Sequence, residues 1–119
     1  MDVQSYQDLI AWQKAMVMVT EVYELTKMFP TDERFGLTSQ IRRAAVSVPS
    51  NIAEGQARNS TGEFLQFLGI ARGSIAEVTT QLLIARNLEF VADIDHLLGT
   101  ISEVGRILNG LIKSLKPNH

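Results

Sequence analysis

The chain has 119 residues, a formal net charge of -2 at pH 7 and no cysteine. This length suits one domain, residues 1–119, that buries about two-thirds of the surface of its unfolded chain. The lack of cysteine excludes disulfides and thiolate metal sites. The two histidines, His96 and His119, lie far apart in the sequence, so we expect no metal site.

Neither the N-terminus nor any apolar segment suggests targeting to a membrane. Asp2 and Asp8 lie where a signal peptide would carry basic residues. Charged residues interrupt each apolar segment well before the roughly 18 residues that a membrane span requires. We therefore expect a cytoplasmic protein with no membrane partner.

The charges are unevenly distributed along the chain. Residues 1–33 carry two lysines and six acidic residues (-4), and residues 34–86 carry six arginines and three acidic residues (+3). Residues 87–119 carry three basic and four acidic residues (-1). The overall pI of about 5.6 is far below the value above about 9 that is typical of nucleic-acid-binding domains.

The first predicted helix runs from about Tyr6 to Met28, with Ser5 as its N-cap and Phe29-Pro30 at its end. Apolar residues form two adjacent seams at helical spacing, Leu9/Trp12/Met16/Val19/Tyr23 and Ala11/Ala15/Met18/Val22/Leu25. Together the seams cover roughly 200° of the helix surface, more than packing in one bundle requires. The surplus indicates a contact between subunits. The alternative is that Ala11, Ala15 and Met18 are ordinary flanking core.

The second predicted helix has Thr38 as its N-cap, continues to about Ala57 and contains Pro49, which predicts a kink. One face is an apolar stripe, and another is a polar seam formed by Arg43, Ser47, Ser50 and Glu54. One helix therefore presents both an apolar and a polar surface.

The third predicted helix begins at the capping box Ser60-Thr61-Gly62-Glu63 and ends near Asn87. It carries a ridge of small residues that would let another backbone approach closely: Gly69, Gly73, Ala76 and Thr80. The fourth helix is expected from the cap Asp93 to about Leu115. Four long helices with short connections predict an all-α fold, an antiparallel up-down-up-down four-helix bundle with a proline-kinked second helix.

A hairpin centred near Asn59 places residue i of the second helix opposite residue 118 - i of the third. In this register Pro49 faces Gly69, and Glu77 faces the turn that carries Arg42 and Arg43. A buried glutamate without a partner is unfavourable. We therefore predict an ion pair between Glu77 and one of these two arginines.

The candidate interaction residues are the polar side chains of the second and third helices: Arg42, Arg43, Ser47, Ser50, Asn51, Glu54, Arg72 and Glu77. They are consistent with an internal network that fixes helix register or a subunit contact, with a small-ligand or anion site at the proline, or with a solvated face. No G-x-S-x-G, P-loop, H-E-x-x-H or dinucleotide-binding motif occurs in the sequence. We therefore expect neither catalysis nor a cofactor.

Several of these motifs resemble one known family. They are Trp12 with Ala15, Val22-Tyr23, Phe29-Pro30, the run Glu33–Gln40, Arg42–Ser47, Pro49, Asn51–Gly55 and Gly73-Ser74 with Glu77. This pattern is similar to the four-helix-bundle proteins encoded by intervening sequences within bacterial large-subunit ribosomal RNA genes. The resemblance implies an antiparallel bundle that assembles into homo-oligomers, expected to be pentameric rings, without established enzymatic activity.

The chain also resembles the accessory protein of diversity-generating retroelements, a basic pentameric barrel that engages nucleic acid and a reverse transcriptase. The acidic net charge of this chain departs from that pattern. Nucleic-acid binding therefore does not carry over from that protein. We expect a non-catalytic homo-oligomeric scaffold or adaptor, for which RNA or nucleoprotein is a candidate further partner. The alternative is a small-ligand-binding bundle that uses the polar seam of the second helix.

Overall fold

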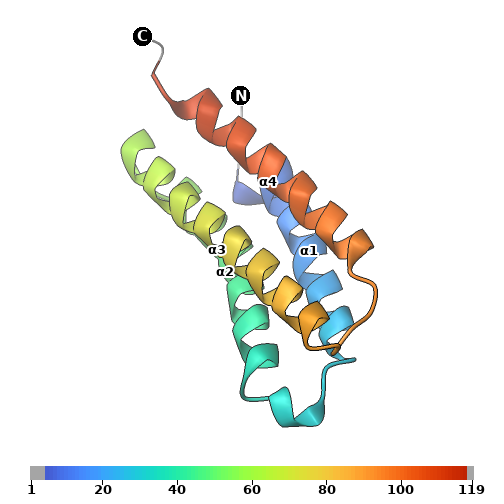
Figure 1. Ribbon diagram of the computed structural model, residues 1–119. Coiled ribbons are helices and arrows are strands. Elements are labelled where there is room, and N and C mark those ends of the chain that lie inside the picture. Colours follow the sequence, from blue (N-terminus) through green and yellow to red (C-terminus); the bar gives the residue numbers. More distant parts are fainter. Residues whose placement is uncertain (1–4, 118–119) are drawn as a thin grey trace.

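The computed structural model describes residues 5–117 and shows an all-helical chain (Figure 1). Its elements are the short 3-10 helices η1 (Tyr6–Asp8) and η2 (Thr31–Glu33) and the long helices α1 (Ile10–Thr26), α2 (Leu37–Gln56), α3 (Thr61–Asn87) and α4 (Asp95–Leu115). No strand occurs among the described residues, and the predicted all-α class is confirmed.

Each long helix packs against its neighbours in the sequence, and α4 also packs against α1. The pair α2 and α3 shares the most extensive contact, while α1 and α3 lie across a diagonal of the bundle. Between them lies a continuous apolar core, whose largest fully buried side chains include Met18, Ile41, Ile52, Leu82 and Leu108. The bundle is elongated, with extents of 47 × 23 × 21 Å.

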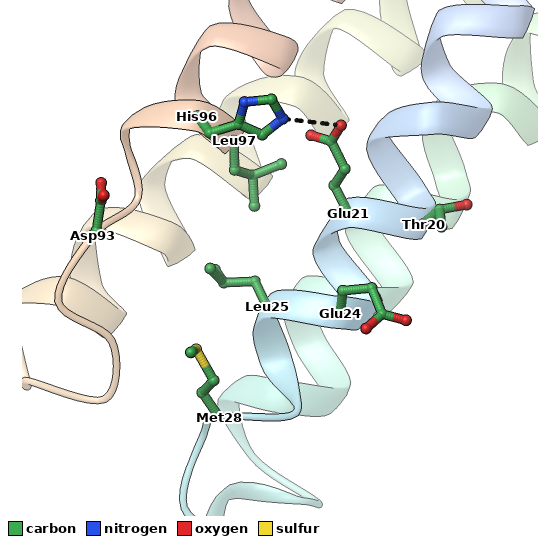
Figure 2. Close-up of a pocket in the computed structure, with 8 residues that line it drawn as sticks. All are labelled: Thr20, Glu21, Glu24, Leu25, Met28, Asp93, His96 and Leu97. Carbon is green, nitrogen blue, oxygen red and sulfur yellow. Dashed lines mark hydrogen bonds and ion pairs between the residues drawn. The ribbon is translucent and has the colours of Figure 1, made fainter.

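Polar contacts tie α1 to α4 along the outside of the core. Glu21 accepts a hydrogen bond of 2.7 Å from the Thr100 hydroxyl and lies 3.3 Å from Nε2 of His96 (Figure 2). Nearer the other end of α4, Lys14 and Glu103 form an ion pair of 3.5 Å. The residue numbers of the two partners change in opposite directions, so α1 and α4 are antiparallel.

The start of the first helix differs from the prediction. Ser5 is a cap, but it caps η1: its hydroxyl accepts from the Gln7 amide, and Asp8 accepts from the Ser5 amide. Leu9 then adopts an extended conformation (φ -76°, ψ 126°), and α1 begins only at Ile10. Leu9 is buried in the core although it lies at the break between η1 and α1. Hydrophobic spacing alone does not reveal this break.

The start of α2 also differs. Thr38 is a buried residue of the first turn, and the N-cap position is Gly36. A side-chain carboxylate from the preceding loop replaces the expected cap, because Oε1 of Glu33 accepts a 3.0 Å hydrogen bond from the Leu37 amide. A Cβ at Gly36 would lie only 2.8 Å from this carboxylate oxygen. The absence of a side chain at Gly36 thus leaves room for the cap.

The predicted N-cap of α3, Ser60, is confirmed, but the reciprocal bond of a capping box, from the Ser60 amide to the Glu63 carboxylate, is not formed. Oγ of Ser60 accepts from the Glu63 amide at 3.2 Å and lies at the same distance from the Glu63 carboxylate. The Asp93 carboxylate accepts from the Asp95 amide, so it acts one position before the cap Ile94 of α4.

The predicted register between α2 and α3 is wrong by about three residues. Ser47 contacts Ser74, and a Cβ at Gly55 would lie against Phe67, so facing residues sum to about 121 and not 118. The hairpin is centred one to two residues later than predicted.

The ridge of small residues on α3 faces outward, because it lies on the face opposite the buried stripe that includes Leu68, Ser74 and Val78. Gly69 and Gly73 are exposed, and a Cβ at either would meet no atom within 4 Å. Pro49 is buried inside α2, on the side toward Trp12 and Val19 of α1. The expected contact between Pro49 and Gly69 is therefore wrong, while the kink stays a prediction.

Within residues 5–117, no helix combines the length and the apolarity needed to span a membrane. The same residues contain no group of three or more histidine and carboxylate side chains placed to hold a metal ion.

Candidate functional site: a polar cleft between α2 and α3

A cleft of about 380 Å³ runs between α2 and α3. We call it the polar cleft, and it is lined by Gln40, Arg43, Ala44 and Ser47 from α2 and by Ser74, Glu77 and Gln81 from α3. Spacings of three and four residues place each set on one face of its helix. The antiparallel register then pairs the two sets along the cleft.

Hydroxyl groups close one end of the polar cleft. Oγ of Ser47 and Oγ of Ser74 lie 2.8 Å apart, and Ser74 is buried. The Asn51 amide donates to both Oγ and the backbone carbonyl of Ser47, each at 2.8 Å. This network joins the two helices where their side chains are small, which is the register-fixing role expected for part of the polar seam.

The middle of the polar cleft carries one charge of each sign, Arg43 on α2 and Glu77 on α3. Both side chains are exposed, and the predicted ion pair between Glu77 and Arg42 or Arg43 is wrong, since it is absent from the pairs formed among residues 5–117. Glu77 lies beside the buried α3 stripe that includes Ser74 and Val78, where water solvates its carboxylate. The ion pairs found within 4.0 Å among residues 5–117 include neither Arg43 nor Glu77.

The other end of the polar cleft contains an unsatisfied acceptor. Oε1 of Gln81 is buried and has no hydrogen-bond partner, the only such side-chain atom in the described part of the chain. A buried acceptor without a partner costs about 1–3 kcal/mol. The cleft therefore lacks a hydrogen-bond donor at this point.

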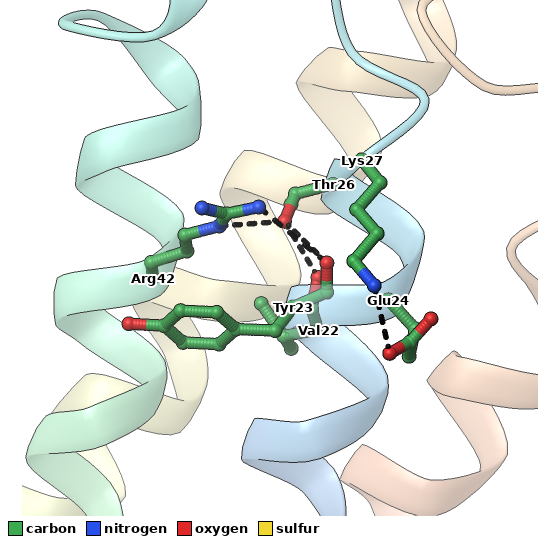
Figure 3. Close-up of polar contacts among 6 residues, drawn as sticks. All are labelled: Val22, Tyr23, Glu24, Thr26, Lys27 and Arg42. Atoms are coloured by element: carbon green, nitrogen blue, oxygen red, sulfur yellow. Dashed lines mark hydrogen bonds and ion pairs between the residues drawn. The ribbon is translucent and has the colours of Figure 1, made fainter.

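Arg42 lies on another face of α2 and contacts α1 (Figure 3). Its Nε donates to the Thr26 hydroxyl at 2.8 Å, and Nη2 lies 3.5 Å from the Tyr23 carbonyl. The guanidinium also stacks 4.6 Å from the centroid of the Tyr23 ring. Arg42 thus fixes α2 against α1 and does not pair with Glu77.

Replacing Thr26 by valine is expected to lower the free energy of unfolding by about 1–2 kcal/mol. Thr26 is buried, and valine would keep its shape while removing the acceptor for Nε of Arg42. Urea denaturation measures the change. The matched control is Thr79→Val, because the Thr79 hydroxyl bonds only the Ile75 carbonyl of its own helix. Equal losses in the two variants would contradict a tertiary role for Thr26.

The remaining predicted residues lie apart from the polar cleft. Glu54 forms an ion pair of 2.8 Å with Arg58, and exposed Ser50 lines a groove toward α1. Arg72 is exposed and makes no hydrogen bond or ion pair with any described residue. The polar seam is thus divided between two sides of α2.

Sequence reasoning missed Ser74, Gln40 and Gln81. The spacing of the residues themselves carried a signal, because Gln40 precedes Arg43 by three positions and Gln81 follows Glu77 by four. With the observed register, both glutamines fall at the same end of the cleft.

A second surface feature, on the other side of α2, is apolar. We call it the α1/α2 apolar face, a groove of about 350 Å³ formed chiefly by Tyr6, Trp12, Met16, Val19, Val46 and Pro49. The Tyr6 and Trp12 rings pack edge to face with centroids 5.4 Å apart. Ala11, Ala15 and Met18 are core, so the alternative interpretation of these three residues is confirmed. The apolar surface that α1 leaves exposed is on the other seam, with Met16 42% and Tyr23 38% exposed.

A further hollow, of about 370 Å³, lies between the end of α1 and the start of α4 (Figure 2). Leu25, Met28 and Leu97 form its apolar interior. The carboxylate of Glu21 at its rim is already bonded to Thr100. This hollow therefore offers less unused polar chemistry than the polar cleft.

The comparisons with known proteins agree with the fold. Residues 7–110 match the family model described as 23S rRNA-intervening sequence protein. A crystal structure of a protein of unknown function from the S23 ribosomal protein family of Bacteroides thetaiotaomicron superposes with a TM-score of 0.80 at 21% identity, covering 87% of this chain and 99% of that one. No curated protein matches. Because the family model covers most of the sequence, this chain belongs to the family of 23S rRNA-intervening sequence proteins.

Proposed function

We propose that this protein is a non-catalytic scaffold whose protomers associate into a ring, with five protomers as the family resemblance implies. The observation that carries this proposal is the uncovered α1/α2 apolar face. Met16 is 42% exposed and Val46 40% exposed, and they line one groove with Trp12 and Pro49. Singly exposed apolar side chains are ordinary, but a contiguous set of this kind marks an interaction surface.

The opposite side of the bundle supplies a complementary surface. Gly69, Gly73, Ala76 and Thr80 are all exposed on α3, which lies diagonally across the bundle from α1. Ile70 and Ile84 are exposed on the same helix, at 48% and 41%. A surface with such short side chains would accept the bulky groups of the α1/α2 apolar face from a neighbour.

Contact between two different surfaces on opposite sides of a protomer is heterologous. Repetition of such a contact gives a ring when the rotation closes. The two faces described above therefore favour cyclic assembly over a twofold dimer.

Trp12 provides a direct test, because it is the only tryptophan of the chain and lies on the α1/α2 apolar face. We expect its fluorescence emission to shift to longer wavelength when the protein is diluted below the dissociation constant, since dissociation exposes the indole to water. Far-UV circular dichroism should stay constant over the same dilution. An emission maximum that stays constant down to nanomolar protein, together with a monomeric mass by light scattering, would contradict the proposal.

The scaffold proposal includes RNA as a further partner. The six arginines of residues 34–86 are partly engaged, because Arg42 stacks on Tyr23 and Arg58 on Phe67. Ring formation would repeat the free cations Arg43, Arg72 and Arg86 around the assembly and raise its local field.

RNA binding would then weaken steeply with salt. We expect a gel-mobility shift of ribosomal RNA at low ionic strength that disappears near physiological salt. The absence of any shift at low ionic strength would remove RNA from the proposal and leave the scaffold intact.

A second candidate function, binding of a small ligand, is supported by the polar cleft. The specific observation is the buried, unpartnered Oε1 of Gln81, which lies in a cleft with unpaired Arg43 and Glu77. A ligand donor would satisfy this atom once the Gln81 side chain turns toward the cleft. An increase in melting temperature with a small polar compound, abolished by Arg43→Gln, would support this function.

A further inference from the structure

We infer that the polar cleft binds a small zwitterion, a molecule with a carboxylate at one end and an ammonium group at the other. This inference rests on the second candidate function and specifies its ligand class. It follows from the charges, hydrogen-bond capacity and register of the residues that line the cleft.

The α2 side of the cleft is suited to a carboxylate. Arg43 is exposed, lines the cleft and has no acidic partner within 4.0 Å among the described residues. Its planar guanidinium can bind a carboxylate through two parallel hydrogen bonds. Gln40 lies one turn away on the same face and adds an amide donor.

The α3 side of the cleft is suited to an ammonium group. Glu77 and Gln81 are four residues apart, so both project from one face of the helix. Glu77 offers an unpaired carboxylate, and the Gln81 side chain carries a buried Oε1 that lacks a donor. Once the Gln81 side chain turns toward the cleft, an ammonium group, with three N–H donors, can serve both acceptors at once.

A direct ion pair between Arg43 and Glu77 would not satisfy every polar group of the cleft, because Oε1 of Gln81 would still lack a donor. A simple anion would occupy Arg43 alone, and a simple cation would leave Arg43 unused. The Ser47–Ser74 hydrogen bond closes one end of the cleft at 2.8 Å. A cavity of about 380 Å³ is large enough for an amino acid.

The length of the ligand can be measured with ω-amino acids. Glycine, β-alanine and γ-aminobutyric acid carry the same two charges at increasing separation. We would titrate each into isotopically labelled protein and follow the amide resonances of α2 and α3 by NMR. Propionate and propylamine are the matched controls, because each keeps only one of the charges.

We expect one of the three amino acids to bind at least tenfold more tightly than either control. Arg43→Gln and Glu77→Gln should each weaken that binding about tenfold or more, because each removes one charge-assisted contact. Arg72→Gln is the control variant, since Arg72 is exposed on α3 and absent from the cleft lining. The double variant Arg43→Glu with Glu77→Arg exchanges the charges, and it should recover part of the binding with the ligand reversed.

The possible failures can be told apart. Propionate binding as tightly as the amino acids, and through Arg43, would overturn the zwitterion while leaving a small-ligand function in place. Folded protein that shows no shift with any of the five compounds would overturn the zwitterion, and a parallel absence of thermal stabilisation by other polar compounds would overturn the small-ligand function. Loss of binding in Arg72→Gln equal to that in Arg43→Gln would overturn the assignment to the cleft.

Discussion

Gly55→Ala is expected to lower the free energy of unfolding by about 1–3 kcal/mol, the usual range for inserting a methyl group into a packed interface. Gly55 is buried in α2 against α3. A Cβ there would lie 2.8 Å from Cβ of Phe67 and 3.0 Å from Cδ1 of Phe64. Because Cβ of Phe67 is attached to the backbone, rotation of a side chain cannot relieve this contact. The helices α2 and α3 would have to separate.

The control for this prediction is Gly99→Ala. Gly99 is exposed within α4, and a Cβ there meets no atom within 4 Å. Alanine is the better helix former, so this variant should be more stable by about 0.5–1 kcal/mol. Urea denaturation of both variants measures the two values. A Gly55→Ala protein as stable as the parent would contradict the close approach of α2 and α3.

Met16→Asp is expected to convert the assembly into monomers without unfolding the bundle. Met16 is 42% exposed in the isolated chain, so an aspartate there remains solvated in the monomer. In the proposed ring the same carboxylate would be buried against α3 of a neighbour without a partner, which is strongly unfavourable. Light scattering measures the mass, and Asn109→Asp, at an exposed position of α4, is the control.

A second variant tests which surfaces meet. Ala76→Asp places a carboxylate on the outward ridge of α3 and should also give monomers. Each variant keeps one intact surface, so mixing them should give dimers of about 26 kDa, twice the 13.2 kDa of one chain. A mixture that stays monomeric, or an Ala76→Asp protein that stays assembled, would contradict the heterologous contact.

The sequence predicted the start of a helix correctly where a short local motif determines it. The N-cap Ser60 fixes the start of α3 through a contact within four residues. The breaks at Leu9 and Gly36 depend on longer-range features: Leu9 is buried in the core, and the Glu33 carboxylate folds back over the start of α2. Hydrophobic periodicity does not reveal either of these interactions.

The candidate site was only partly predictable because it depends on the register between two helices. Ser47 and Asn51 were identified as candidate residues from the sequence. Ser74 was not, because a register error of three residues displaces the residue expected opposite Ser47 by nearly one helical turn. The glycine ridge of α3 faces outward for another reason, because the buried stripe of that helix occupies the opposite face. Gln81 could not be identified from the sequence, because its unsatisfied buried Oε1 is visible only in the structure.

Two surfaces of α2 now have different assignments. Its side toward α1 carries the apolar groove with Val46 and Pro49, and its side toward α3 carries the polar cleft with Arg43 and Ser47. Assembly and ligand binding are therefore separable, and Met16→Asp protein should bind the zwitterion as the parent does.

The mass of the parent protein in solution tests the central proposal most directly. Multi-angle light scattering at micromolar concentration should give about 66 kDa, five times the 13.2 kDa of one chain. The mass of another closed ring would support the scaffold proposal and change only the number of protomers. A mass of about 13 kDa at all concentrations up to the millimolar range would contradict self-association through the α1/α2 apolar face.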